Sequence, residues 1–243
     1  VDKSRQKARE DKLEWEEYEK LVSFFNNKPN IQCFLTVAME SLGRPQELLF
    51  IRIKDCLIYD QYARLTAPSH TKEGIKEMQI IDSLPYLIKW LEVHPTKKNK
   101  DSFLFVSMSD KTFGRQMTPF AINKQIRLAC KILGIKKPIT NYSCKRNGIT
   151  FRRLRGDSDL TIMHHAGWTS TKQLQTYDLS TNKDTYKLEL IKRGIIKAER
   201  GLEQFEPKYK ECLFCNIKNG FTDEFCNNCK RPLDSEKIKK LIE

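Results

Sequence analysis

The sequence has no long hydrophobic run. No window approaches the roughly 20 apolar residues that a membrane-spanning helix needs, and the charged opening segment VDKSRQKARED contains no apolar signal region. We therefore expect no membrane partner and a cytoplasmic location. The first residue is Val1 rather than Met, so we expect the chain to be a fragment or an expressed domain. Internal repeats and long low-complexity tracts are also missing, which argues against a repeat architecture.

The cysteines have no spacing typical of a disulfide framework. Four of the eight are scattered along the chain, and the other four form two Cys-x-x-Cys pairs, Cys212 with Cys215 and Cys226 with Cys229. Two such pairs can supply the tetrahedral thiolate cage that Zn²⁺ prefers, although a redox dithiol is the competing interpretation. We expect a structural Zn²⁺ in a small ribbon, because so short a segment cannot build its own core. Four thiolates leave no open position for catalysis.

Acidic residues are too few to balance the basic ones. The chain has 44 Lys and Arg against 31 Asp and Glu, a net charge of +13 and a pI near 9.3. A field of this sign attracts polyanions, of which nucleic acid is the commonest, whereas the plainer interpretation is a solvated lysine-rich surface. Lys124, Arg127 and Lys131 recur at a spacing that places them on one helix face, where they can follow a nucleic-acid backbone.

Hydrophobic periodicity predicts a mainly α fold with a small antiparallel β-sheet and an appended ribbon. Helices are expected at 13–25, 33–42, 44–49, 84–91, 118–133, 142–154, 160–166, 172–177 and 184–198. Strand-like runs are expected at 56–59, 64–67 and 79–81, and the last two flank a polar segment at 69–76. The expected organisation is a lead-in (1–12), a main domain (13–199), a linker (200–211), the ribbon (212–232) and a tail (233–243).

Three short segments stand out between these elements. The first is Gly43-Arg44-Pro45-Gln46-Glu47, which follows a buried helix. The second is the turn Thr71-Lys72-Glu73-Gly74. The third begins at Gly156, continues to Ala166-Gly167-Trp168, and ends at Tyr177, nine residues beyond Trp168. Each segment alone is also compatible with a surface turn or with a packed aromatic residue, but their order and spacing agree with one another.

Together these segments resemble the tyrosine recombinase (phage integrase) family over about residues 13–193. The resemblance implies a Xer-like catalytic domain, and the appended ribbon is more typical of archaeal or archaeal-viral members. It implies that Tyr177 is the nucleophile, that Arg44 binds the scissile phosphate and that Trp168 positions it. Lys72, at the tip of the hairpin, corresponds to the family's general acid.

One motif departs from the family pattern of His-x-x-Arg before Gly156. Counting without gaps places Tyr142 at the histidine and Lys145 at the arginine, whereas a shift of one residue places Ser143 and Arg146 there. A planar guanidinium binds two phosphate oxygens, which favours Arg146, while the spacing favours Lys145. We lean slightly to Arg146 and keep both, and the usual histidine is missing in either case.

The resemblance implies a site-specific recombinase that cleaves and rejoins double-stranded DNA through a 3′-phosphotyrosine and needs no cofactor for catalysis. It further implies a homo-tetramer on paired DNA sites, associated with the nucleoid. Family members also carry an N-terminal DNA-clamping domain, so we expect the chain to be a catalytic fragment. The alternatives are a catalytically degenerate DNA-binding protein, a zinc-ribbon adaptor for other proteins, and a type IB topoisomerase.

Overall fold

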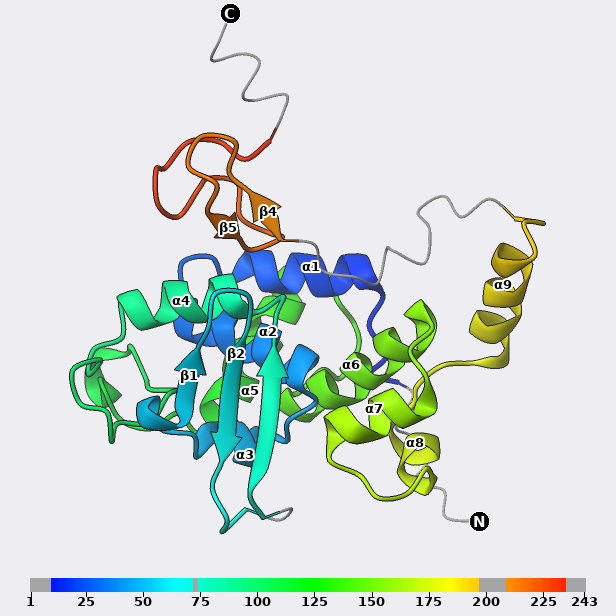
Figure 1. Cartoon of the computed structure of the whole chain (residues 1–243), viewed down its shortest axis with the longest axis horizontal. Coiled ribbons are helices and arrows are strands. Elements are labelled where there is room, and N and C mark those ends of the chain that lie inside the picture. Colours follow the sequence, from blue (N-terminus) through cyan, green and yellow to red (C-terminus); the bar gives the residue numbers. More distant parts are fainter. Residues whose placement is uncertain (1–9, 72–73, 197–208, 235–243) are drawn as a thin grey trace, which may run out of the picture.

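The computed structural model describes residues 10–71, 74–196 and 209–234. It confirms the predicted fold class, which is mostly helical with a small antiparallel sheet (Figure 1). The helices are α1 (Trp15–Phe24), α2 (Pro29–Ser41), α3 (Pro45–Leu49), α4 (Leu84–Glu92), α5 (Pro119–Leu133), α6 (Asn141–Arg155), α7 (Asp159–Ala166), α8 (Lys172–Tyr177) and α9 (Asn182–Lys192). Most of the predicted lead-in, linker and tail lies outside the described residues.

Helix boundaries follow the local capping chemistry. Proline occupies the first turn of α2, α3, α4 and α5, where its missing N–H costs no intrahelical hydrogen bond. Gly134, Gly156 and Gly167 end α5, α6 and α7 in the left-handed conformation. Helix α2 begins at Pro29, four residues before the apolar run that predicted it. Helix α9 ends at Lys192 and has no buried residue, so the prediction of an amphipathic helix extending to residue 198 was wrong.

The sheet consists of β1 (Cys56–Ile58), β2 (Ala63–Ala67) and β3 (Lys76–Ile80) in the order β1-β2-β3, with both pairs antiparallel. Strand β3 alternates buried and exposed residues, so Lys76, Met78 and Ile80 all face inward. A charged residue, Lys76, therefore occupies the first inward position of β3.

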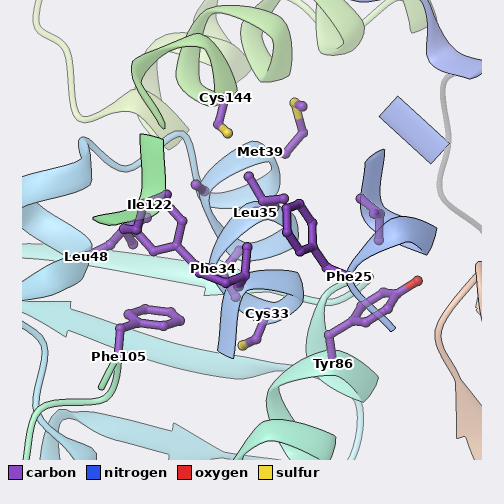
Figure 2. Close-up of a cluster of buried hydrophobic side chains, with 14 of the residues drawn as sticks. Phe25, Cys33, Phe34, Leu35, Met39, Leu48, Tyr86, Phe105, Ile122 and Cys144 are labelled. Carbon is purple, nitrogen blue, oxygen red and sulfur yellow. The ribbon is translucent and has the colours of Figure 1, made fainter. Parts of the chain in front are cut away.

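Helix α2 runs through the centre of the core. Figure 2 shows Cys33, Phe34, Leu35 and Met39 of this helix surrounded by side chains from other elements, including Tyr86, Phe105 and Ile122. Helix α6 packs directly on α2, because a Cβ atom at Gly148 would lie 2.1 Å from the carbonyl oxygen of Met39. Only glycine permits this backbone contact. A second cluster, formed by Leu42, Ile149, Ile162, Ala166, Trp168 and Leu174, lies beside the first.

The C-terminal segment 209–234 packs on the main domain. It contains a two-stranded sheet of β4 (Lys210–Glu211) and β5 (Lys218–Asn219). Figure 1 shows this segment beside α1 and α4, while α3 and α8 lie on the other side of the domain. In the described part of the chain, no helix combines the length and the apolar character needed to cross a bilayer.

Candidate active site

Arg44 lies at the N-terminus of α3 and is held by Glu47. Its Nη1 donates to Glu47 Oε1 at 2.9 Å, and its backbone N–H donates to Glu47 Oε2 at 2.7 Å. The side chain of Glu47 is 1% exposed. Burial raises the pKa of Glu47, but Lys76 and the two hydrogen bonds from Arg44 outweigh it and lower that pKa. The carboxylate is therefore ionised and fixes the orientation of Arg44.

Lys76 is the second cation of this cluster. Its Nζ lies 3.7 Å from Glu47 Oε2 and donates to the carbonyl oxygen of Leu42 at 3.4 Å. Its stem passes Gly167, where an added Cβ atom would lie 3.3 Å from Lys76 Cε. Lys76 thus joins the arginine segment to the turn that precedes Trp168. The sequence reasoning did not select this residue, although the inward alternation with Met78 and Ile80 could have identified it.

Lys145 on α6 is the third cation and is fully buried. Its Nζ lies 5.3 Å from the ring centroid of Trp168 and 5.5 Å from that of Tyr177. The charge of Lys145 also contributes to the lowered pKa of Glu47. Lys145 therefore connects the arginine segment with the two aromatic residues.

Arg146 faces a different part of the protein. Its guanidinium forms an ion pair with Asp11, and its Nε donates to Asp11 Oδ2 at 3.0 Å. Asp11 also accepts from Ser143 Oγ at 2.6 Å. The structure thus brings Lys145, rather than Arg146, together with Trp168 and Tyr177. Tyr142, one turn earlier on α6, is 43% exposed.

Trp168 and Tyr177 pack against each other, with ring centroids 5.1 Å apart. Gly167, at φ 71°, ends α7, and the backbone N–H of Trp168 donates to Met163 O at 2.9 Å, which turns Trp168 into the cluster. The buried indole Nε1 of Trp168 has no hydrogen-bond partner among the described residues. An N–H group in this state favours an added acceptor.

The position of Tyr177 is fixed by anchors on both sides. Leu174 is buried on α8, and Leu179 N donates to Thr150 Oγ1 on α6 at 2.9 Å. Asp178 pairs with Arg153 Nε at 3.0 Å. These contacts join α8 to the helix that carries Lys145. Lys72, the expected hairpin lysine, lies outside the described residues.

The cluster is rich in cations. Arg44, Lys76 and Lys145 all interact with the buried carboxylate of Glu47. The side chain of Arg44 is 12% exposed, and Lys145 is fully buried. Such a site is suited to an anion, and arginine and lysine beside an indole N–H suit phosphate oxygens in particular.

The four C-terminal cysteines form a compact group on the other side of the domain. Their sulfur atoms all lie within 4.8 Å of one another, and the Cys212–Cys229 and Cys215–Cys226 pairs are each 3.5 Å apart. Tetrahedral zinc with Zn–S bonds of about 2.3 Å requires sulfur separations of about 3.8 Å, so the group fits this ion. Burial raises the pKa of Cys226, but hydrogen bonds from the backbone N–H groups of Cys229 and Asn228 more than offset it and lower that pKa to about 6.

Lys124, Arg127 and Lys131 are all exposed on α5. Exposure is necessary for side chains that contact the backbone of a nucleic acid. Other basic residues that follow Lys145 on α6 are engaged within the protein. Arg152 and Arg155 both pair with Asp157, and Arg153 pairs with Asp159 and Asp178. The cations available for a polyanion therefore include those on α5, whereas the arginines at the end of α6 mainly stabilise the fold.

A scan against family models matches residues 11–184 to the phage integrase family. No curated protein matches the chain at a significant level. Among solved structures, XerA recombinase is similar, with 16% identity and a TM-score of 0.63 over 77% of this chain and 64% of that one.

Two DNA complexes are also similar. XerH recombinase in a post-cleavage complex with palindromic difH has 15% identity and a TM-score of 0.60, over 75% of this chain and 53% of that chain. A lambda integrase dimer on a COC′ core site has 18% identity and a TM-score of 0.52, over 68% of this chain and 47% of that chain. At such identities the likeness shows the fold alone. The chain spans about half to two thirds of the length of these proteins.

Proposed function

The chain belongs to the phage integrase family of tyrosine recombinases, and from this premise we propose that it is a site-specific DNA recombinase with Tyr177 as its nucleophile. The observation that carries the proposal is the convergence of Tyr177, Trp168 and Lys145 with the Arg44–Glu47 pair. These residues come from four separate elements of the chain, so sequence proximity does not explain their meeting.

In the proposed reaction, the phenol oxygen of Tyr177 attacks a phosphorus atom of double-stranded DNA. A 3′-phosphotyrosyl bond forms, the bond to the 5′-oxygen breaks, and the tyrosine proton leaves the phenol as it attacks. The new ester retains the energy of the broken one, so a 5′-hydroxyl from another strand can reverse the step without a cofactor.

The cations have a defined task in this step. Negative charge develops on the non-bridging oxygens, and Arg44 and Lys145 stabilise it from a preorganised, partly dry site. The indole N–H of Trp168 supplies a further donor. Glu47 holds Arg44 in place, and Lys72 is the candidate that protonates the departing 5′-oxygen. We assign Lys145 to the arginine position of the His-x-x-Arg pattern, since Arg146 is paired with Asp11.

The remaining parts of the proposal concern partners and the metal. Cys212, Cys215, Cys226 and Cys229 hold a structural Zn²⁺, which supplies folding energy and takes no part in strand transfer. Lys124, Arg127 and Lys131 contact the DNA backbone. Recombination joins two sites, so the working form is a homo-tetramer on paired DNA, and its location is the nucleoid.

Covalent capture from a mixed pool of DNA tests the nucleophile and does not require a chosen target sequence. Nicked duplexes, from which the released strand diffuses away, are incubated with the protein, and adducts that survive denaturant are isolated. Wild-type protein should yield adducts with a nucleotide on the peptide that contains Tyr177. Tyr177→Phe should yield none, whereas Tyr186→Phe, which alters a tyrosine 64% exposed on α9, should behave as wild type. An adduct from Tyr177→Phe rejects the assignment.

A second candidate is a DNA-binding protein that has lost strand transfer. It is favoured by the presence of a lysine, Lys145, and an exposed tyrosine, Tyr142, where the family pattern has arginine and histidine. This candidate predicts DNA binding that weakens steeply with added salt, together with no adduct from any variant. Wild-type adducts would exclude it.

A further inference from the structure

The four-cysteine segment is attached to the helix that carries Lys145 by a continuous path of side chains. We propose that metal binding at Cys212, Cys215, Cys226 and Cys229 stabilises α6, and that Phe221 is the residue that transmits this effect. The inference rests on the zinc part of the proposed function and does not depend on strand transfer. It makes the segment an integral part of the main domain rather than an independent appendage.

Phe221 lies between the two cysteine pairs and packs into the aromatic part of the main core. Its ring centroid lies 6.0 Å from those of Trp15 and Tyr18 on α1, and 5.7 Å from that of Tyr86 on α4. Trp15 and Tyr86 are themselves buried, at 6% and 1% exposure. By contrast Phe225, four residues later in the same segment, is 52% exposed.

The chain beside Phe221 fits too closely against α4 to be a loose contact. A Cβ atom at Gly220 would lie 2.3 Å from Tyr86 Cζ, so no other residue fits there without a shift. The hydroxyl of Tyr86 accepts from Thr222 N at 3.0 Å and lies 2.8 Å from Thr222 Oγ1. A buried tyrosine hydroxyl needs such partners, and the segment supplies them.

A polar path connects the same contact to the cysteines. Asp223, 4% exposed, accepts from Gly220 N at 2.8 Å and from Asn227 Nδ2 at 2.9 Å, and it lies 3.4 Å from Lys89 Nζ on α4. Asn227 stands between Cys226 and Cys229, and its backbone N–H donates to Asn219 Oδ1 at 2.8 Å. Loss of the metal would loosen the Cys226–Cys229 turn, and with it the partners of Asp223.

The path continues from Trp15 to α6. The ring of Trp15 lies 5.1 Å from that of Phe151 on α6, at an interplanar angle of 71°. Just before Trp15, Leu13 N donates to Asn147 Oδ1 at 2.7 Å, and Asp11 pairs with Arg146. Residues 146, 147 and 151 lie within two turns of Lys145. Displacement of Trp15 therefore disturbs the helix that carries the buried cation of the proposed active site.

The test uses the full chain loaded with zinc and measured without DNA. Amide hydrogen exchange is followed in α1 and α6, before and after removal of zinc by a chelator, together with the melting temperature. Chelation should raise exchange in α6 by about tenfold or more, since local opening reports local stability. Phe221→Ala should lower the melting temperature by about 5–10 °C while one zinc stays bound. Phe225→Ala should leave amide exchange in α6 and the melting temperature near the wild-type values.

Three results overturn the inference. The first is exchange that rises after chelation only within 209–234 while α6 is unchanged, and the second is a melting shift for Phe221→Ala no larger than that for Phe225→Ala. The third is a wild-type protein that binds no zinc, which would overturn the metal assignment as well. If zinc binds and α6 responds but DNA is never captured covalently, the recombinase proposal fails and this inference stands.

Discussion

Glu47→Gln tests whether one buried carboxylate balances the cations of the proposed site. Glutamine keeps the size of the side chain and removes its charge. Arg44, Lys76 and Lys145 would then lose a negative charge with which all three interact. Removing one partner from a buried ion pair costs about 3–5 kcal/mol, because the remaining charge stays desolvated and uncompensated.

The expected size of the effect follows from the chain length. For a chain of 243 residues, each kcal/mol changes the melting temperature by about 2–4 °C, so Glu47→Gln should lower it by about 10 °C. The matched control is Glu77→Gln on β3, where a carboxylate 59% exposed lies 3.8 Å from Arg64. An exposed pair of this kind contributes about 0–1 kcal/mol.

Melting curves in anion-free buffer, with sulfate and with DNA provide the assay. Added anions should recover more stability in Glu47→Gln than in wild type, since they supply the missing negative charge. Folding lowers the pKa of Glu47. The ionised carboxylate therefore contributes its full stabilisation above the pKa of glutamate in the unfolded chain, about 4.3. That stabilisation is lost as the pH falls through the lower pKa of Glu47 in the folded protein. The difference in melting temperature between wild type and Glu47→Gln should therefore be constant from about pH 6 to about pH 8 and should shrink in acid.

If Glu47→Gln has the same melting temperature as the Glu77→Gln control, this reasoning is refuted. It would mean that the three cations are stable without the negative charge of Glu47. A variant that is destabilised but gains nothing extra from sulfate or DNA would refute the weaker claim that the cluster is an anion site.

Three further predictions follow from the same contacts. Lys145→Met should weaken DNA binding, because it removes a cation that lies beside the rings of Trp168 and Tyr177. A DNA affinity equal to that of wild type, measured by fluorescence anisotropy, would contradict this prediction. Burial and the nearby Arg152 lower the pKa of His165 to about 4, so wild-type stability should fall as the pH decreases from about 6.5 to 4. His165→Gln should flatten that slope, and an unchanged slope in the variant would contradict the prediction. Arg146→Met should lower the free energy of unfolding in urea by about 1–3 kcal/mol, because it leaves Asp11 without its ion pair. The variant should still capture DNA covalently. Loss of capture in a folded variant would mean that Arg146 belongs to the active site.

Much of the fold could be predicted because its signals are local. Proline in the first turn, glycine at the C-terminus and helical spacing of apolar residues located most helices within a few residues. The start of α2 was missed because Asn30 and Gln32 are polar yet buried, with hydrogen bonds to Val106 O and Val22 O that only the tertiary structure supplies. The predicted extent of α9 failed because none of its apolar residues is buried, so the apolar pattern at 193–196 is not accompanied by a buried helical face.

The site was only partly predictable. The spacing of Trp168 and Tyr177 depends on one turn and one short helix, and the structure does bring the two rings together. The choice between Lys145 and Arg146 depends on Asp11, which lies about 135 positions earlier in the chain and attracts Arg146 away from the cluster. Adjacent residues on a helix point about 100° apart, so chemistry alone could not decide between them. The docking of Phe221 depends likewise on the aromatic residues of α1 and α4, which no local pattern reveals.

The glycine contact between α2 and α6 has a consequence for how the protein can change. Since no side chain stands between Gly148 and the carbonyl of Met39, the separation of the two helices is set by main-chain atoms. The surrounding interior can therefore exchange one apolar residue for another without moving the end of α2, where Arg44 follows, relative to Lys145. A library of all amino acids at position 148 should return glycine alone, whereas neighbouring interior positions should tolerate many substitutes.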